Sequence, residues 1–263
     1  SAFLRPHEAA VAAHSGHILV HETGAIEATG HKVISVDSPD GKLTPGQIVP
    51  ALEFHTDEHM VKPRLVYISN PTEVGTVYGR KELEGLHAFC KEHNLLLYVD
   101  GARLGSALCA PGSGLDLEAM AELTDTFYIG GTKCGALVGE ALVISNPSLK
   151  EDFRFHLKQK GALLSKGRLM GIQFLELFRD GLYFDLARHS NRMADLLRNA
   201  IAGAGYSFLT DSPSNQLFPI LPNRLIEKLQ EEFDFYVWDE RTGEVRWVAS
   251  WDTTEEDVAR LAV

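Results

Sequence analysis

The stretch "DTFYIGGTKCGALVGEALVIS", residues 125–145, places one lysine, Lys133, between two apolar runs that are typical of buried strands. Gly131 and Gly135 flank this lysine, as in a tight turn at the mouth of a strand. Lysine is almost never fully buried unless it has a partner or a task. Taken alone, Lys133 is most simply a turn residue whose ammonium group points to water. A functional role for it therefore depends on the rest of the chain.

Short apolar runs alternate with amphipathic stretches before and around this lysine. The predicted strands span residues 33–36, 65–69 and 95–99, and the predicted helices span residues 45–54 and 80–93. Near-continuous apolar strands that alternate with helices indicate an α/β fold with a mainly parallel sheet flanked by helices. Ligands of such folds bind at the carboxyl ends of the strands, and Asp100 and Lys133 both fall at such ends.

The pattern changes after residue 148. Residues 148–205 are predicted to be helical throughout, with long apolar faces. Three short strand-like runs follow, "NQLFPIL", "FDFYVWD" and "EVRWVASWD", around a predicted helix at 224–232. We therefore expect a large α/β domain at 1–150, connecting helices at 151–205 and a smaller C-terminal α+β domain at 206–263.

The composition excludes several classes of partner. The formal net charge is −11, with 25 Lys and Arg against 36 Asp and Glu in 263 residues. Nucleic acids and anionic membranes bind clusters of basic residues, and the sequence has no basic run. Its apolar runs are shorter than the ~20 residues that cross a bilayer, and it opens with no secretory leader. Three cysteines without CxxC spacing suggest reduced thiols, so we expect a cytoplasmic protein.

Several motifs occur here in the order in which one known family carries them. They are "GHILVHETGA", "ISNPTEVGT", "YVDGARLGSAL", "GGTKCG", "NRMA", "SNQLFPILP" and "RWVASWD". With these motifs the chain resembles the threonine aldolases from Arg5 to its C-terminus. The resemblance implies the aspartate aminotransferase fold (fold type I) of enzymes that use pyridoxal 5'-phosphate (PLP). It also implies retro-aldol cleavage of L-threonine or L-allo-threonine to glycine and acetaldehyde, in a homo-oligomer, a dimer or tetramer, with active sites at subunit interfaces.

The resemblance assigns roles to the two residues at the strand ends. Lys133 in "GGTK" matches the lysine that binds the cofactor's aldehyde covalently, as a lysine amine can do. Asp100 in "YVDGA" matches the carboxylate that keeps the cofactor's pyridine nitrogen protonated. Without the resemblance, Asp100 would more simply be a turn residue before Gly101.

Three more residues match functional positions of the family. His17 matches a histidine that stacks on the cofactor ring, Arg103 an arginine near the cofactor and the substrate carboxylate, and Arg246 the arginine that clamps that carboxylate. Each also has a simpler interpretation. His17 would be a half-buried helix histidine, Arg103 a surface ion-pair partner and Arg246 an arginine in an edge strand.

Acidic and histidine side chains cluster near His17. His14, His17, His21 and Glu22 have the HxxH and HxxxH spacings that zinc sites use. Helical geometry would place His17 and His21 on one side. No known zinc fold accompanies this cluster, so we expect no metal.

One departure from the family concerns the substrate's hydroxyl group. Many low-specificity threonine aldolases carry a histidine that reaches this hydroxyl, after the asparagine of the third-strand motif. Here Thr72 or Glu73 occupies that place and is the candidate for the contact. The base that removes the hydroxyl proton is therefore His17, Glu73 or a bound water.

A second departure is at the start of the chain. Family members carry a Gly-Thr-rich phosphate loop upstream of "RPHEAAVAA", residues 5–13, which we interpret as part of the helix that follows that loop. Without the loop, we expect these residues alone to bind PLP weakly. The candidates for contacting the phosphate are then Thr132 and Lys166 of the partner subunit.

Three other functions stay open from the sequence. The same scaffold supports β-elimination and amino-acid racemisation, because these reactions begin with the same attachment of the amino acid to the cofactor. A non-catalytic chain with the PLP fold is the second alternative. A metal-binding module built on the histidine cluster is the third.

Overall fold

The computed structural model describes residues 1–261, and most of its first half is built around a six-stranded sheet in the order β2-β1-β3-β4-β5-β6. Its strands are β1 (Glu8–Ala13), β2 (Val33–Val36), β3 (Lys62–Ser69), β4 (Leu96–Asp100), β5 (Thr126–Ile129) and β6 (Ala141–Ile144). The first five strands pair in parallel, and β6 runs antiparallel to β5. The mainly parallel sheet predicted from the strand and helix alternation is confirmed.

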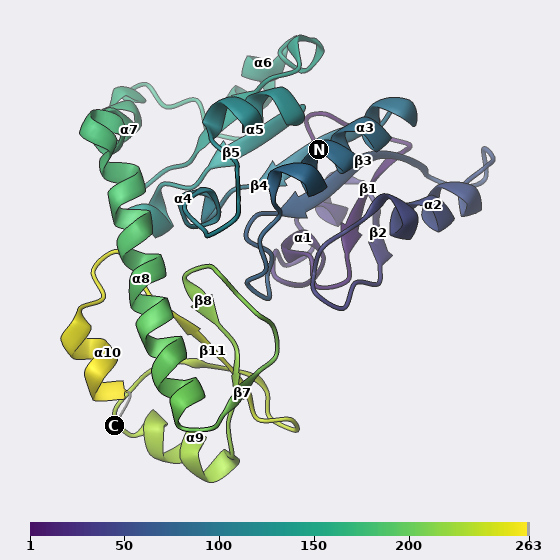
Figure 1. Ribbon diagram of the computed structural model, residues 1–263. Coiled ribbons are helices and arrows are strands. Elements are labelled where there is room, and N and C mark those ends of the chain that lie inside the picture. Colours follow the sequence, from purple (N-terminus) through teal and green to yellow (C-terminus); the bar gives the residue numbers. More distant parts are fainter. Residues whose placement is uncertain (262–263) are drawn as a thin grey trace.

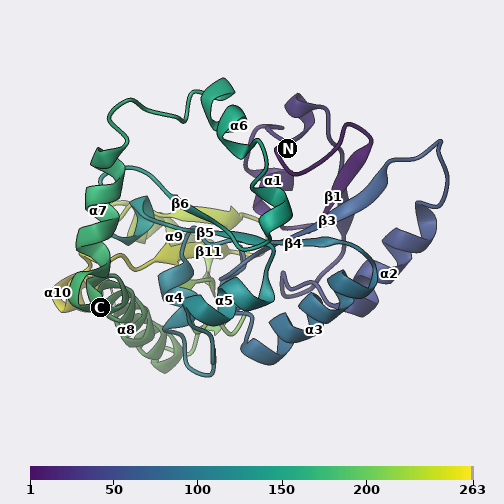
Figure 2. The ribbon, with the colours of Figure 1, turned by 90° about the horizontal axis from the view of Figure 1, so that it is seen from above.

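Four helices lie along one face of this sheet, as Figure 2 shows. They are α2 (Pro45–Phe54), α3 (Arg80–Glu92), α4 (Leu104–Leu108) and α5 (Leu117–Leu123). Helix α2 begins where the sequence predicts, because Thr44, the residue before Pro45, forms a capping box with Gln47 in the first turn. The apolar faces of these helices and the strands beneath them make the main hydrophobic core.

The other face of the sheet is covered partly by the short helix α1 (His17–Val20) and the N-terminal residues. A connecting region then leads from β6 to the second half of the chain. It contains α6 (Phe153–Gln159), α7 (Arg168–Phe178) and the 3₁₀ segments η3 (Pro147–Leu149) and η4 (Arg179–Gly181). Two more 3₁₀ segments, η1 (Glu27–Thr29) and η2 (Thr132–Cys134), lie in loops after α1 and β5.

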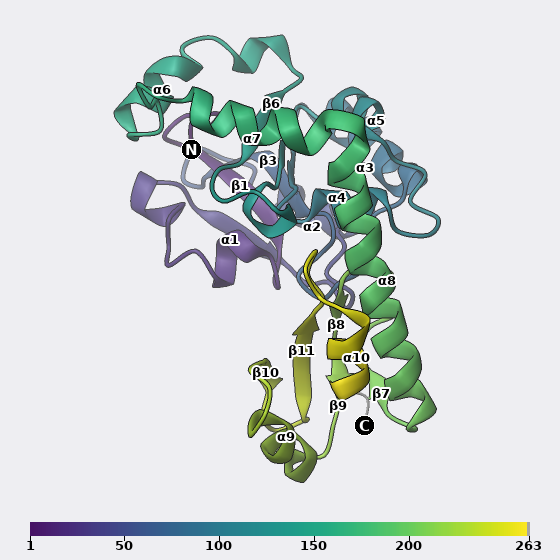
Figure 3. The same ribbon diagram turned by 90° about the vertical axis from the view of Figure 1, so that its left-hand side faces the viewer.

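The long helix α8 (Leu182–Gly203) joins the large sheet to a small one, as Figures 1 and 3 show. Near its start Tyr183 belongs to the main core, and from Met193 onward it belongs to a second core. The small sheet contains β7 (Ser207–Phe208), β8 (Gln216–Leu217), β9 (Pro219–Ile220), β10 (Tyr236–Asp239) and β11 (Glu244–Val248), with helices α9 (Asn223–Gln230) and α10 (Glu255–Leu261). The domain boundaries expected at 150 and 205 stay a prediction.

The expected helix at residues 5–13 is wrong, because Glu8–Ala13 form strand β1 in the interior of the sheet. All six residues of β1 are buried, and β1 pairs with both β2 and β3. Alanine favours a helix when nothing else intervenes. A run of small apolar residues also suits a strand that is covered on both faces, and here the tertiary context decides.

Within residues 1–261, no helix combines the length and the apolar character that spanning a bilayer requires.

Candidate active site

Most of the side chains singled out in the sequence meet in a cavity of about 270 Å³ at the carboxyl ends of the parallel strands. Ser69 ends β3 and Asp100 ends β4, and the two residues are directly opposite in the sheet register. The small sheet supplies the opposite wall with Tyr236, Trp238 and Arg246. The cavity is therefore built jointly by the two sheets, which Figure 3 shows one above the other.

Lys133 reaches this cavity from η2, the 3₁₀ turn that follows β5. Glu140 holds the turn by accepting hydrogen bonds from the Gly131 N–H at 2.5 Å and from the Thr132 hydroxyl at 2.6 Å. Loss of hydration, and then repulsion by the Arg103 guanidinium, hold the pKa of Lys133 below its usual range. A lowered pKa increases the fraction of neutral amine, which is the nucleophilic form.

Asp100 is held by three donors at the floor of the cavity. Its Oδ1 accepts from the Tyr128 hydroxyl at 2.5 Å and from the Ala102 N–H at 3.0 Å, and its Oδ2 accepts from the Tyr67 hydroxyl. Burial, followed by the Asp100 charge, raises the pKa of both phenols, so both stay protonated donors. These three donors orient the carboxylate, which still lines the cavity.

Tyr67 and Tyr128 were not among the candidates from the sequence. Their only signal is a tyrosine within a predicted apolar strand, which implies a hydrogen-bond partner without identifying it. The glycine after Asp100 is also required, because a Cβ on Gly101 would lie 1.9 Å from the Tyr128 carbonyl oxygen.

The guanidinium groups of Arg103 and Arg246 line the cavity, and neither forms an ion pair with a carboxylate within residues 1–261. Burial, followed by repulsion from Arg246, lowers the pKa of Arg103 to about 10. Arg246 donates from Nη2 to the Gln216 side-chain oxygen at 2.6 Å, and its buried Nε has no partner in the described chain. Two unpaired cations that repel each other make the cavity suitable for an anion.

Arg246 does not lie in an edge strand, which corrects the simpler interpretation of its place. It belongs to β11, which lies between β10 and β9 in the small sheet. Its guanidinium is also 5.9 Å from the centre of the Trp238 ring on β10. A central strand fixes this side chain more firmly than an edge strand would.

His17 begins α1 and forms one wall of the cavity. Its backbone N–H donates to Glu73 Oε1 at 2.8 Å, and its ring Nδ1 lies 2.6 Å from Glu22 Oε1. The rings of His17 and His21 are 5.1 Å apart, on one side as predicted. His14 bonds instead to Ser35, and no three possible metal-ligating side chains come together anywhere in residues 1–261.

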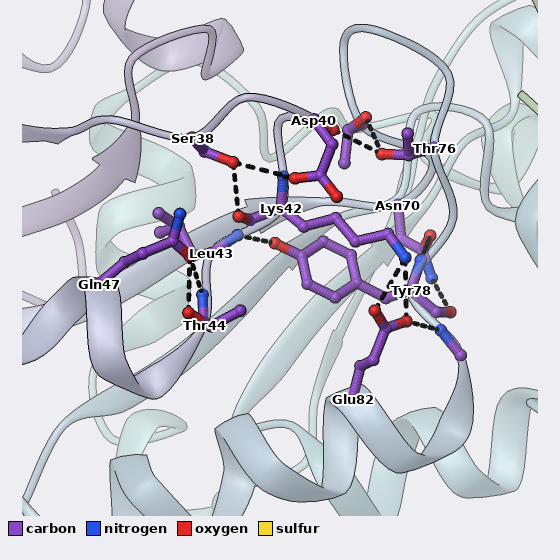
Figure 4. Close-up of polar contacts among 12 residues, drawn as sticks. Ser38, Asp40, Lys42, Leu43, Thr44, Gln47, Asn70, Thr76, Tyr78 and Glu82 are labelled. Atoms are coloured by element: carbon purple, nitrogen blue, oxygen red, sulfur yellow. Dashed lines mark hydrogen bonds and ion pairs between the residues drawn. The ribbon is translucent and has the colours of Figure 1, made fainter. Parts of the chain in front are cut away.

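The loop at residues 70–78 contributes Thr72 and Glu73 to the cavity lining. Hydrogen bonds of Asn70, Thr76 and Tyr78 hold this loop in place (Figure 4). The Asn70 side-chain oxygen accepts from the Tyr78 N–H at 3.0 Å, and the Asn70 side-chain nitrogen donates to the Tyr78 carbonyl oxygen at 3.3 Å. Thr76 donates to the Asp40 carbonyl at 2.7 Å. Thr72 lines the cavity, but its hydroxyl is bonded to Thr76 at 2.7 Å and is therefore engaged elsewhere.

Glu73 is almost fully buried, with 9% of its surface exposed. Its Oε1 accepts from the Ser69 hydroxyl at 2.6 Å as well as from the His17 N–H. Burial raises the pKa of this carboxyl, although these two hydrogen bonds oppose the shift. Both of these hydrogen bonds use Oε1, and Glu73 lines the cavity.

Two candidates for the phosphate group lie outside the cavity. Thr132 is exposed, and its hydroxyl is used by Glu140. The expected contact between Thr132 and the cofactor therefore stays a prediction. Lys166 lies exposed between α6 and α7, so its reach into the site of another subunit stays a prediction.

Comparison with known proteins places the chain in a family. Residues 1–220 match the family model described as beta-eliminating lyase, so the chain belongs to the lyases of that kind. The chain is 36% identical over 267 residues to a low specificity L-threonine aldolase of Pseudomonas aeruginosa, and 35% identical over 271 residues to another of Pseudomonas sp.. Each alignment covers 100% of this chain and 77% of the relative.

Solved structures agree with this placement. The threonine aldolase of Leishmania major is similar with a TM-score of 0.96 and 51% identity, over 99% of this chain and 77% of that one. A Thermus thermophilus aspartate aminotransferase mutant is similar with a TM-score of 0.71 and 19% identity, over 99% of this chain and 70% of that one, and it shows the fold alone. The chain belongs to the threonine aldolases, and the expected fold type I is confirmed.

Proposed function

We propose that this protein binds PLP and cleaves L-threonine or L-allo-threonine to glycine and acetaldehyde. One observation carries the proposal beyond family membership. A single cavity brings together a lysine with a lowered pKa, a carboxylate held by two phenols, and two guanidinium groups without carboxylate partners in the described chain. These are the groups that an aldehyde cofactor and an amino-acid substrate require.

The residues of the cavity fit PLP. Lys133 offers an amine to the cofactor's aldehyde, and His17 offers a ring whose orientation is held by Glu22. When bound, PLP accepts the electrons of the bond that breaks at the amino acid's Cα. Asp100 holds the proton on the pyridine nitrogen, because an acceptor carboxylate favours the charged form of its donor.

Arg246 and Arg103 bind the α-carboxylate of the substrate. A guanidinium group is a planar fork of donors that matches a carboxylate, and both groups lack a competing carboxylate in the described chain. Fixing the carboxylate fixes the direction of the Cα–Cβ bond. This orientation selects which bond breaks, because only a correctly oriented bond reacts rapidly.

Glu73 is the group that we assign to the β-hydroxyl proton. Its carboxylate takes that proton while the Cα–Cβ bond breaks, and the hydroxyl oxygen then forms the carbonyl of acetaldehyde. The raised pKa makes Glu73 a stronger base than an exposed carboxylate. The braced loop and the bonds to Oε1 hold the carboxylate in place.

Glu73→Gln is expected to reduce kcat for threonine cleavage by about 10²–10⁴-fold, the usual range for a positioned proton acceptor. Glutamine keeps the shape and the acceptor for Ser69 but cannot take a proton. Exchange of the glycine α-proton with deuterated water, followed by NMR, is expected to stay close to the wild-type rate, because it involves no hydroxyl proton. Glu82→Gln, which changes an exposed carboxylate paired with Lys42, is the matched control. An equal loss in both reactions would assign Glu73 a structural role instead.

The products formed from threonine test the proposed function itself. The PLP-loaded protein is expected to cleave both L-threonine and L-allo-threonine. Each substrate is expected to give one glycine for every acetaldehyde. Formation of ammonia and 2-oxobutanoate would identify a β-eliminating enzyme. Formation of D-allo-threonine from L-threonine, or of D-threonine from L-allo-threonine, would identify a racemase. Either result would refute the aldolase assignment.

We also propose that the protein is a cytoplasmic homo-oligomer, a dimer or tetramer. Its three cysteines are free, which suits a reducing compartment. Helix α7 exposes an apolar stripe, with Leu169, Ile172 and Leu175 each 58–64% exposed, and such a stripe favours association. Sedimentation equilibrium that returns the mass of one chain would contradict the oligomer.

A further inference from the structure

Gln216 is a buried residue that contacts both walls of the cavity. It lies in β8 with 2% of its surface exposed. Its side-chain oxygen accepts from Arg246 Nη2 at 2.6 Å, and its side-chain nitrogen lies 3.5 Å from the Thr72 carbonyl oxygen as a donor. One amide thus connects the arginine of the small sheet to the loop at residues 70–78.

The sheet register brings Gln216 and Arg246 to the same face. Strand β8 pairs antiparallel with β11, with Gln216 opposite Val248. Side chains two residues apart on a strand share a face, so Arg246 is the diagonal neighbour of Gln216. The contact therefore follows from the backbone pairing and needs no unusual side-chain conformation.

Chemistry determines how the amide of Gln216 is oriented. The oxygen faces a guanidinium, which only donates hydrogen bonds, and the nitrogen faces a carbonyl, which only accepts them. The opposite orientation would place donor against donor and acceptor against acceptor. The two contacts thus hold the amide in a single orientation.

The backbone around Gln216 is locked to the same loop. The Gln216 N–H donates to the Ser214 hydroxyl at 3.3 Å, Ser214 and Ser212 share a hydrogen bond at 2.9 Å, and Ser212 donates to the Gly75 carbonyl at 2.9 Å. A Cβ on Gly75 would lie 2.4 Å from the Ser212 oxygen, so this close packing requires glycine. The amide of Gln216 therefore has a rigid support.

We infer that Gln216 is a positioning residue that holds the Arg246 guanidinium ready for the carboxylate of the amino-acid substrate. The inference rests on the proposed function. A neutral amide is suited to this task, because it fixes one N–H of Arg246 without neutralising its charge. A carboxylate at the same place would pair with Arg246 and compete with the substrate.

Two substitutions separate the hydrogen-bond acceptor of Gln216 from its lack of charge. Gln216→Met keeps the length of the side chain but removes the acceptor, and Gln216→Glu adds the competing charge. Gln159→Glu adds the same charge at an exposed residue at the end of α6 and serves as the control. Thermal unfolding of each variant shows whether it is folded.

Binding of two amines to the PLP-loaded protein, followed by the absorbance of the cofactor, tests the inference. Glycine carries the carboxylate and ethanolamine does not. Gln216→Met is expected to weaken glycine binding by about tenfold, and Gln216→Glu by about 100-fold, the range for hydrogen bonds to charged groups. Ethanolamine binding is expected to change by less than about twofold, and KM for threonine is expected to rise more than kcat falls.

The outcomes distinguish the inference from the function on which it rests. Glycine binding that is unchanged in both Gln216 variants, or ethanolamine binding that weakens in proportion, would overturn the positioning role. If the wild-type protein binds neither amine and leaves threonine intact, the proposed function fails and this inference fails with it. Arg246→Ala that loses glycine binding, beside Gln216→Met that keeps it, would refute the role of Gln216 alone.

Discussion

Lys133→Ala is expected to reduce threonine cleavage by about 10³-fold or more, in the upper part of the range for positioned proton-transfer groups. Lys133 is the lysine that lines the cavity, and its lowered pKa provides the neutral amine that can bond to an aldehyde. Lys133 belongs to neither hydrophobic core, and Glu140 holds its turn through Gly131 and Thr132, so the fold is expected to survive. Steady-state kinetics measures the loss of cleavage, and thermal unfolding shows whether the fold is retained.

Chemical labelling tests the same residue without relying on activity. Borohydride treatment of the PLP-loaded wild-type protein is expected to fix the cofactor on the peptide that contains Lys133. Mass spectrometry of the digested protein locates the label, and Lys133→Ala is expected to carry none. Recovery of the label on Lys160 or Lys166 would refute the assignment, because both lie outside the cavity.

Asp100→Asn is expected to retain the fold and to lose turnover by about 10²–10³-fold, the usual loss when a preorganised electrostatic contact is removed. Asparagine has nearly the same shape, and the phenols of Tyr67 and Tyr128 can each donate or accept a hydrogen bond. The neutral amide lacks the charge that holds the proton on the pyridine nitrogen. The loss therefore falls on kcat, with KM and the melting temperature close to their wild-type values.

A matched control separates charge from any general effect of the substitution. Asp57→Asn makes the same change in an exposed turn, where the Asp57 carboxylate contacts the backbone N–H and the ring of His59. It is expected to behave as the wild-type protein does. Turnover by Asp100→Asn close to that of this control would contradict the role of the Asp100 charge.

Much of the large sheet follows from local pattern. The apolar runs that become β2, β3 and β4 are near-continuous, and the amphipathic segments between them have the helical period. Parallel strands place their carboxyl ends at one edge, so residues that end neighbouring strands are expected to meet. This reasoning brings Asp100 and Lys133 to the same edge before any coordinates are known.

Local pattern failed where two structures suit the same residues. The alanine-rich segment that forms β1 has a strong helix propensity, yet it pairs with two strands and is buried on both faces. Small apolar residues satisfy both a helix and a buried strand. Pairing with residues that lie far along the chain decides between the two, and no local signal reports that pairing.

The sequence by itself determined the alternation of strands and helices, the strand ends that carry Asp100 and Lys133, and the family motifs. Only the tertiary structure decided the partners of those residues. The two phenols on Asp100 come from strands on either side of β4, and Glu73 meets the backbone of His17 across 56 residues of chain. Gln216 reaches Thr72 across 144 residues and joins the two sheets. Such contacts depend on strand register and on how the sheets pack, and long-range pairing sets both.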